Sequence, residues 1–340
     1  MATLLGMGNP LLDISAVVPN EELAKWDAKP GDALLVMPET EAKYNPLYDS
    51  LTADYPVEYI AGGATQNSIR VAQWMTQSPG ATAYIGCIGT DKAGEQLKAS
   101  LALDGVTNHY LEDASTPTGK CAVLVNSGDR ALIANIQAAN NYKIDHLKEN
   151  TAVLEAASIV YSAGFFLTVS VESMVMAADA CKAAGKTYCL NLSAPFLMQV
   201  PPLFDGMKQV LPKADVIFCN ETEAATFAEV SGWDTKDCKE IAKRLQALDK
   251  ETAEKPRMVV ITQGADPTVV ATATEVTEYP VIKCDNIVDT NGAGDSFVGG
   301  FLSGMMKKQP ISECVRAGNY AANVVIQRSG CSYPAKPDFA

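Results

Sequence analysis

The stretch "DTNGAGDSF", residues Asp289–Phe297, joins an apolar segment to a predicted helix with an acidic start. The preceding "YPVIKCDNIV" predicts a strand and "DSFVGGFLSGMM" predicts a helix, so Asn291–Gly294 are expected to form the turn between them. Glycines allow a sharp turn, and their amides together with a helix N-terminus form a hollow for an anion such as phosphate. Asp295 lies beside this hollow, where a carboxylate can accept a proton from a hydroxyl group. The stretch therefore predicts phosphoryl transfer, although a tight turn capped by Asp295 explains the same residues.

Outside this stretch, short β-branched runs alternate with helical patterns from about residue 80 onward. The predicted strands are Thr82–Ile88, Ile159–Ser162, Thr187–Leu192, Val216–Asn220 and Arg257–Thr262. The alternation predicts the α/β class, with a doubly wound, mainly parallel sheet that is covered by helices on both faces.

Two regions, 14–60 and about 118–136, lack this alternation, because strands such as Cys121–Val125 follow one another without good helix signals. We expect these two regions to form a separate small sheet outside the main one. The charged segment Asp249–Arg257 contains Pro256 and predicts a solvated surface loop.

Composition excludes several classes of protein. The 340 residues are 47% hydrophobic and contain no apolar run long enough to span a membrane. The net charge of −13 opposes nucleic-acid binding. The nine cysteines form no CxxC pair and the N-terminus lacks a signal-peptide pattern, so we expect reduced thiols and a cytoplasmic protein. A P-loop, a complete dinucleotide fingerprint and protein-kinase signatures are all missing.

Two further stretches could bind a sugar. In "GNPLLDI", Asp13 could grip a diol by accepting two hydrogen bonds, although it is also an ordinary strand-end residue. In "AGGATQNS", the glycines Gly62 and Gly63 allow close backbone approach and Asn67 could bond a sugar hydroxyl, or the stretch is a hinge with a helix cap.

Two strand ends supply polar groups. "NETE" begins at Asn220 and offers an amide and two carboxylates that could hold the water shell of Mg²⁺, or could merely cap a helix. "TQG", which runs from Thr262 to Gly264, ends the next strand in the same way. All these turns are expected at one edge of the parallel sheet, where ligands bind in open α/β folds.

Together these stretches resemble the ribokinase, or PfkB, family of carbohydrate kinases over essentially the full chain. "AGGATQNS" resembles the N-terminal signature of the family and "DTNGAGDSFVGGF" its C-terminal signature. "GNPLLDISAVV", "NLSAPF", "NETEAATFA" and "PAKPDF" are similar to members that act on adenosine. Ala33 departs from the resemblance, which leads us to expect a polar residue there.

The resemblance implies a ribokinase-like fold in two parts. Residues 1–13, 62–117 and 139–340 would form a large α/β domain for nucleotide and substrate. Residues 14–61 and 118–138 would form a small lid domain of β-strands that closes over the ribose end. It further implies adenosine and ATP as small-molecule partners, Mg²⁺ as cofactor, a monomer, and no nucleic-acid or membrane partner.

The resemblance also implies roles for single residues. Asp295 would be the general base, the backbone of Gly292, Ala293 and Gly294 the anion hole, and Arg130 a contact to the phosphates. Asp13 would hold the ribose hydroxyls, with Gly62, Gly63 and Asn67 beside them. Phe165 would stack on adenine in a pocket lined by Asn9, Leu11, Leu35, Cys121, Leu132, Ala134 and Phe196. Nucleotide contacts would come from Asn220, Thr262, Gly264, Asn291 and Asn319, and Mg²⁺ would be organised by Asn220 and Glu223.

Three other functions stay open. Another kinase of the family could act on a free sugar or a different nucleoside, but a free sugar offers nothing for Phe165 to stack on. A dehydrogenase with a variant dinucleotide fold would bind NAD and consume no ATP. A non-catalytic nucleoside-binding protein would bind adenosine without phosphate transfer, and would have no use for Asp295.

Overall fold

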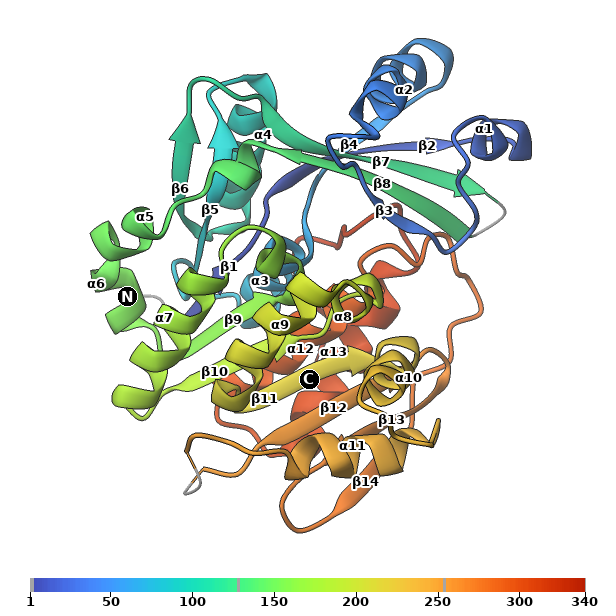
Figure 1. The fold of residues 1–340 in the computed structure, drawn as a ribbon. Coiled ribbons are helices and arrows are strands. Elements are labelled where there is room, and N and C mark those ends of the chain that lie inside the picture. Colours follow the sequence, from blue (N-terminus) through green and yellow to red (C-terminus); the bar gives the residue numbers. More distant parts are fainter. Residues whose placement is uncertain (1–2, 127–128, 253–254, 340) are drawn as a thin grey trace.

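The computed structural model describes residues 3–126, 129–252 and 255–339. Residues 127–128 of the predicted lid and 253–254 of the predicted surface loop lie outside this description. Two β-sheets organise the chain, a large one covered by helices on both faces and a small one beyond its edge (Figure 1). The predicted fold class, a doubly wound and mainly parallel α/β sheet with a small second sheet, is confirmed.

The large sheet contains nine strands of the described chain, in the order β14-β13-β12-β11-β10-β9-β1-β5-β6. Strands β12 to β6 of this order are parallel to one another, and β13 and β14 add an antiparallel hairpin at one edge. Their bounds are β1 Leu4–Met7, β5 Thr82–Gly89, β6 Thr107–Asp113, β9 Ile159–Ala163, β10 Thr187–Asn191, β11 Val216–Asn220, β12 Met258–Gln263, β13 Asp266–Ala271 and β14 Val276–Tyr279. The strands predicted from the β-branched runs are all present.

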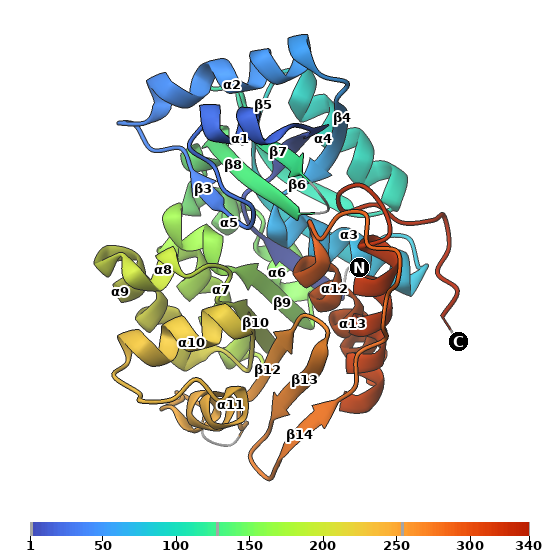
Figure 2. The ribbon, with the colours of Figure 1, turned by 90° about the vertical axis from the view of Figure 1, so that its right-hand side faces the viewer.

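Helices cover both faces of this sheet because its strands are apolar on both sides. One face carries α3 Ala64–Thr76, α4 Lys92–Asp104, α12 Ala293–Met306 and α13 Ile311–Val325. The other carries α5 Ile144–Glu149, α6 Thr151–Ala156, α7 Val171–Ala183, α8 Phe196–Gln199, α9 Pro201–Val210, α10 Glu221–Val230 and α11 Cys238–Ala247. Short 3₁₀ turns lie at η1 Ala138–Asn141, η2 Gly164–Thr168 and η3 Leu211–Lys213. Figure 2 shows α12 and α13 on one side of the sheet and α10 and α11 on the other.

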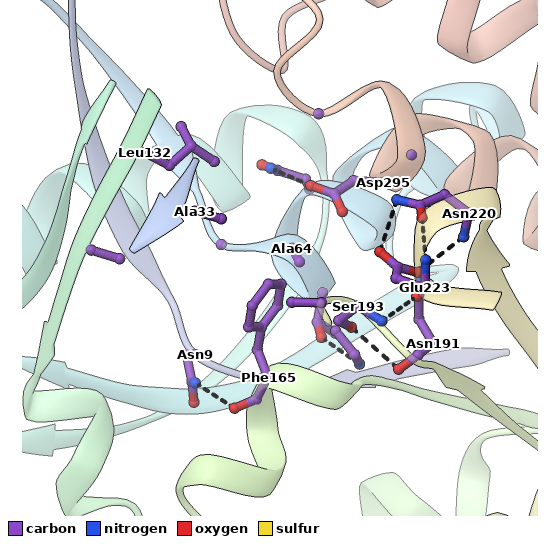
Figure 3. Close-up of a pocket in the computed structure, with 18 of the residues that line it drawn as sticks. Asn9, Ala33, Ala64, Leu132, Phe165, Asn191, Ser193, Asn220, Glu223 and Asp295 are labelled. Atoms are coloured by element: carbon purple, nitrogen blue, oxygen red, sulfur yellow. Dashed lines mark hydrogen bonds between the residues drawn. The ribbon is translucent and has the colours of Figure 1, made fainter. Parts of the chain in front are cut away.

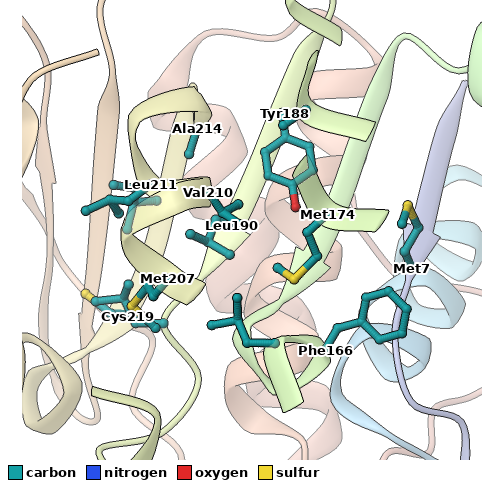
Figure 4. Packing of buried hydrophobic residues seen from close by; sticks show 14 of the residues in the cluster. Met7, Phe166, Met174, Tyr188, Leu190, Met207, Val210, Leu211, Ala214 and Cys219 are labelled. Carbon is teal, nitrogen blue, oxygen red and sulfur yellow. The ribbon is translucent and has the colours of Figure 1, made fainter. Parts of the chain in front are cut away.

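Alternate residues of each strand enter different cores. On β10, Tyr188 and Leu190 pack with Met174 and Met207 on the α7 and α9 side (Figure 4). Cys189, between them in sequence, faces α12 on the opposite side and is fully buried there. This period of two keeps the strand register fixed, since a slip of one residue would exchange the two faces.

The small sheet has the order β3-β8-β7-β2-β4 in the described residues. Its strands are β2 Leu11–Val17, β3 Ala33–Leu35, β4 Glu58–Gly62, β7 Thr118–Asn126 and β8 Asp129–Gln137. One face is covered by α1 Asn20–Lys25 and α2 Glu41–Asp54, and residues such as Ala122 and Leu124 point to them. The alternate residues, among them Cys121 and Val123, form the other face, which looks toward the large sheet.

Two predictions on local structure are corrected. The segment after Tyr279 was expected to be a strand up to residue 288, but β14 ends at Tyr279 and residues 280–290 have no regular structure. Pro280 lacks an amide for the ladder, and Ile282, Ile287 and Val288 are about half exposed, so no partner strand covers them. In the predicted solvated loop, Arg257 is instead buried, with 1% exposed, at the start of β12.

In the described part of the chain, we find no helix that combines the length and apolar character of a membrane span.

Candidate active site

A pocket of about 460 Å³ lies where the parallel strands end at their carboxyl sides and the small sheet faces them (Figure 3). Residues at the ends of β9, β10, β11 and β12 contribute to its wall, as the open-sheet rule predicts. The predicted site residues that line it are Asn9, Leu11, Asp13, Leu35, Gly63, Asn67, Cys121, Arg130, Leu132, Ala134, Phe165, Phe196, Asn220, Glu223, Thr262, Asn291, Gly292, Gly294 and Asp295. The fold thus brings together side chains more than 280 positions apart in sequence.

One end of the pocket is apolar and aromatic. Phe165 belongs to the short turn after β9, and its ring centroid lies 6.1 Å from that of Phe196. The Nδ2 of Asn9 donates to the Phe165 carbonyl at 3.2 Å and so fixes this turn to the end of β1. Opposite them stand the inward residues of the small sheet, Leu35, Cys121, Leu132 and Ala134. A flat apolar ligand such as a purine fits between these walls.

The other end contains the start of α12. Gly292 adopts φ +75° and precedes the first turn of this helix, and no side chain of the described residues caps it. The first amides of a helix have no acceptor within the helix, so they remain available to an anion in the pocket. Asp289 braces the turn, because its two carboxylate oxygens accept from the amides of Asn291 and Gly330, each at 2.8 Å.

Two carboxylates flank this turn. Asp295 accepts from Asn67 Nδ2 at 2.9 Å, and Asp13 accepts from Asn291 Nδ2 at 3.5 Å. Burial raises the pKa of Asp295 to about 6, against the opposing effects of the Asn67 hydrogen bond and the Arg130 charge. Burial, and next the Asp295 charge, raise the pKa of Asp13 to about 7. Shifts of this kind in a pocket are typical of groups that exchange or hold protons.

Arg130 brings a positive charge to the pocket from β8. Its Nη1 donates to the Thr290 hydroxyl, one residue before the turn at Asn291, so the small sheet and the start of α12 are in contact. The Arg130 Nε, together with Asn9 Oδ1 and Asn67 Oδ1, is buried and has no hydrogen-bond partner within the described chain. Buried polar atoms are rarely left unpaired, so three such atoms on the wall of one pocket indicate a polar ligand.

Asn220 and Glu223 cap α10 reciprocally. Glu223 N donates to Asn220 Oδ1 at 2.8 Å, and the backbone amide of Asn220 donates to Glu223 Oε2 at 3.0 Å. Burial raises the pKa of Glu223 to about 7. Within the described residues, no group of three or more His, Cys, Asp or Glu could hold a metal directly. Each oxygen of this pair accepts one hydrogen bond within the pair and retains a further lone pair, and both residues line the pocket, so the donor set fits Mg²⁺ bound through its water shell.

Four predicted residues do not line the pocket. Gly62 lies directly behind Asp13, and a Cβ at this position would be 2.1 Å from Asp13 Oδ1. The Ala293 amide donates to the Thr290 carbonyl at 3.2 Å and is therefore not free for an anion. Gly264 lies in the exposed turn between β12 and β13. Asn319 is buried on α13, where its Nδ2 donates to the Pro280 carbonyl at 3.2 Å.

Sequence reasoning missed the role of Ser193. It lines the pocket in the left-handed conformation, φ +70°, which is costly for a residue other than glycine. Its amide donates to Asn191 Oδ1 at 2.8 Å (Figure 3). Its hydroxyl oxygen accepts from the Gly164 amide at 2.8 Å. Ser193 thus joins the end of β10 to the turn that carries Phe165. Nothing in the stretch "NLSAPF" predicts a positive φ at Ser193.

Comparison with known proteins gives a consistent set of relatives. Residues 34–338 match the pfkB family of carbohydrate kinases. The chain is 55% identical over 340 residues to adenosine kinase 2 of Arabidopsis thaliana, covering 99% of this chain and 97% of that protein. It is similar to the crystal structure of Anopheles gambiae adenosine kinase in complex with P1,P4-di(adenosine-5) tetraphosphate, with TM-score 0.94, 43% identity and 99% of both chains covered.

A third relative is adenosine kinase from Schistosoma mansoni in complex with adenosine and AMP. The TM-score is 0.89 at 30% identity, and the alignment covers 98% of this chain and 97% of that one. The likeness thus spans both sheets and the whole of the pocket. The chain belongs to the pfkB family of carbohydrate kinases.

Proposed function

We propose that this protein transfers the γ-phosphoryl group of ATP to the 5′-hydroxyl of adenosine, giving AMP and ADP. The observation that carries the proposal is that one pocket combines four groups: the aromatic Phe165, the carboxylate of Asp13, the carboxylate of Asp295 and the uncapped start of α12. These groups suit, in turn, the purine, the ribose diol, the 5′-hydroxyl and the transferring phosphoryl group of adenosine with its phosphate donor.

In the proposed reaction, Asp295 accepts the proton of the 5′-hydroxyl while the oxygen attacks the γ-phosphorus. The bond from phosphorus to the β,γ-bridging oxygen breaks, and ADP leaves with its electron pair. The amides around Gly292 and the guanidinium of Arg130 stabilise the charge on the transferring group, which supplies most of the acceleration in such reactions. A Mg²⁺ organised by Asn220 and Glu223 would neutralise charge on the ATP phosphates.

Asp13 and Asn67 would orient the ribose. The ionised Asp13 can accept from both the 2′- and the 3′-hydroxyl, and the unpaired Asn67 Oδ1 can accept from a further donor. The ligands of the relatives support a site for a nucleoside beside a site for a nucleotide, since di(adenosine) tetraphosphate and the pair adenosine plus AMP each carry two adenosine groups.

We further propose that residues 14–61 and 118–138 act as a lid on the large domain formed by 1–13, 62–117 and 139–340. The lid would exclude water, which competes with adenosine for the phosphoryl group. We also propose that the protein acts as a monomer, as the resemblance to the family implies. The nine free thiols favour a reducing compartment such as the cytoplasm.

A coupled assay of ADP release tests the proposal on the purified protein. With ATP and Mg²⁺, we expect rapid release with adenosine, weaker release with inosine and guanosine, and only background release with ribose. Preference for ribose would identify a sugar kinase instead. Reduction of NAD without ATP consumption would identify a dehydrogenase, and adenosine binding without ADP release would identify a binding protein.

A further inference from the structure

Arg70 is a buried cation that none of the proposed catalytic steps uses. It lies on α3 with 9% of its surface exposed, and its Nε contacts Asp104 Oδ2 on α4 at 2.6 Å. Its guanidinium carbon is 5.6 Å from the centre of the Tyr333 ring. Its Nη1 is directed at two backbone carbonyls, and these lead to two different walls of the pocket.

The first carbonyl leads to the ribose wall. Arg70 Nη1 donates to the Ala61 carbonyl at 2.8 Å, near the end of β4. The next residue, Gly62, packs so closely on Asp13 that a Cβ would lie 2.1 Å from Asp13 Oδ1. Because no space separates the two, the position of the β4 end determines the position of the Asp13 carboxylate.

The second carbonyl leads to the phosphate wall. Arg70 Nη1 also reaches the carbonyl of Cys331 at 3.5 Å, in the C-terminal segment that runs beside α3 (Figure 2). The preceding residue, Gly330, donates its amide to Asp289, which braces the turn. Cys331 itself touches this turn, since a Cβ on Gly292 would lie 3.0 Å from the Cys331 Cβ.

We propose that Arg70 is a positioning residue that sets the separation between Asp13, which holds the ribose, and the turn at Gly292, which holds the transferring phosphoryl group. The inference rests on the proposed function. If this separation changes by a fraction of an ångström, both substrates still bind, but the 5′-oxygen and the phosphorus lose their alignment. Loss of Arg70 therefore acts mainly on kcat.

The charge of Arg70 has a second effect, on Asp13. The groups that face Asp13 are Asp295 and Asp289, which raise its pKa, and Asn291 and Arg70, which lower it, while burial raises it most. The thiol of Cys121 on β7 is close but neutral. Removal of the Arg70 charge makes Asp13 harder to ionise, so adenosine binding weakens more at low pH than at high pH.

Steady-state kinetics of three variants between pH 6 and 9 test the proposal. We expect Arg70→Met to lower kcat about tenfold and to raise the KM for adenosine at the acidic end only, with the KM for ATP unchanged. Arg70→Lys keeps the charge without the planar fork. Its kcat should therefore lie between that of the wild type and that of Arg70→Met, and its pH dependence should match the wild type. Arg257→Met is the matched control, because Arg257 is also buried and binds backbone carbonyls, but at the opposite end of the strands.

If Arg70 has only a structural role, the same variants give a different kinetic result. Both Arg70 variants would then lose thermal stability, as Arg257→Met does, while kcat, KM and their pH dependence stay at wild-type values, and this overturns the proposal. Should Arg70→Met not fold, Arg70→Lys decides, and an unchanged kcat overturns the proposal equally. If the wild type itself releases no ADP with adenosine, the proposed function has failed rather than the role of Arg70.

Discussion

Ionisation of the buried Asp295 carboxylate at neutral pH lowers the stability of the folded state. Burial raises its pKa to about 6, above the ordinary value of a free aspartate, so the folded protein binds this proton more tightly than the unfolded chain does. Such a group destabilises the folded state as pH rises through its pKa. We therefore expect Asp295→Asn to lower kcat about 100- to 10,000-fold, as the loss of a positioned base implies, and to raise the melting temperature at pH 7.5. Near-normal turnover, or a lower melting temperature, contradicts this role of Asp295.

A pair of titrating carboxylates also determines the pH profile. Asp13 and Asp295 have pKa values of about 7 and about 6, and both must be ionised, one to hold the diol and one to accept the proton. We expect kcat/KM for adenosine to fall below about pH 7, with a log–log slope that approaches 2 at the acidic end. Asn67→Ala removes a hydrogen bond that lowers the Asp295 pKa, so the acidic limb of kcat should move to higher pH. A flat profile down to pH 5 would disprove the assignment.

The junction of β12 with the ends of α11 and η3 depends on one buried side chain. The Arg257 guanidinium donates to the carbonyls of Ala214, Leu245, Leu248, Leu211 and Asp249. These carbonyls are near helix ends, where the partial negative charge suits a cation. Arg257→Met removes all five of these hydrogen bonds from the protein interior, so we expect the free energy of unfolding in urea to fall by about 3 kcal/mol. The kcat of the folded enzyme should not change, and an unaltered unfolding midpoint would refute this anchoring role.

The elements differ in how far the sequence predicts them. Strands of the large sheet were predictable because their β-branched runs are buried on both faces and local in sequence. The pocket followed from one topological rule, which brings Asn67 and Asp295 together across 228 positions. The positive φ of Ser193 and the burial of Arg257 were not predictable, because both result from contacts with residues distant in sequence. The segment 280–290 contains β-branched residues, as a strand does, but no strand of the described chain pairs with it, so its irregular structure could not be predicted from composition.

The two sheets meet across the pocket, so a nucleoside bound there contacts both and stabilises the whole molecule. Adenosine without ATP should raise the free energy of unfolding by about 2.7 kcal/mol at a concentration 100 times its Kd. In thermal unfolding, we expect Asp295→Asn to keep the full adenosine-induced shift, because it loses a proton acceptor and no binding wall. Asp13→Ala should lose most of the shift, since its diol acceptor is gone. Ribose should give no shift in the wild type, because it has no aromatic base that could stack on Phe165. Equal adenosine shifts in the wild type and Asp13→Ala would place the nucleoside elsewhere, away from the contact between Arg130 of the small sheet and Thr290 before α12.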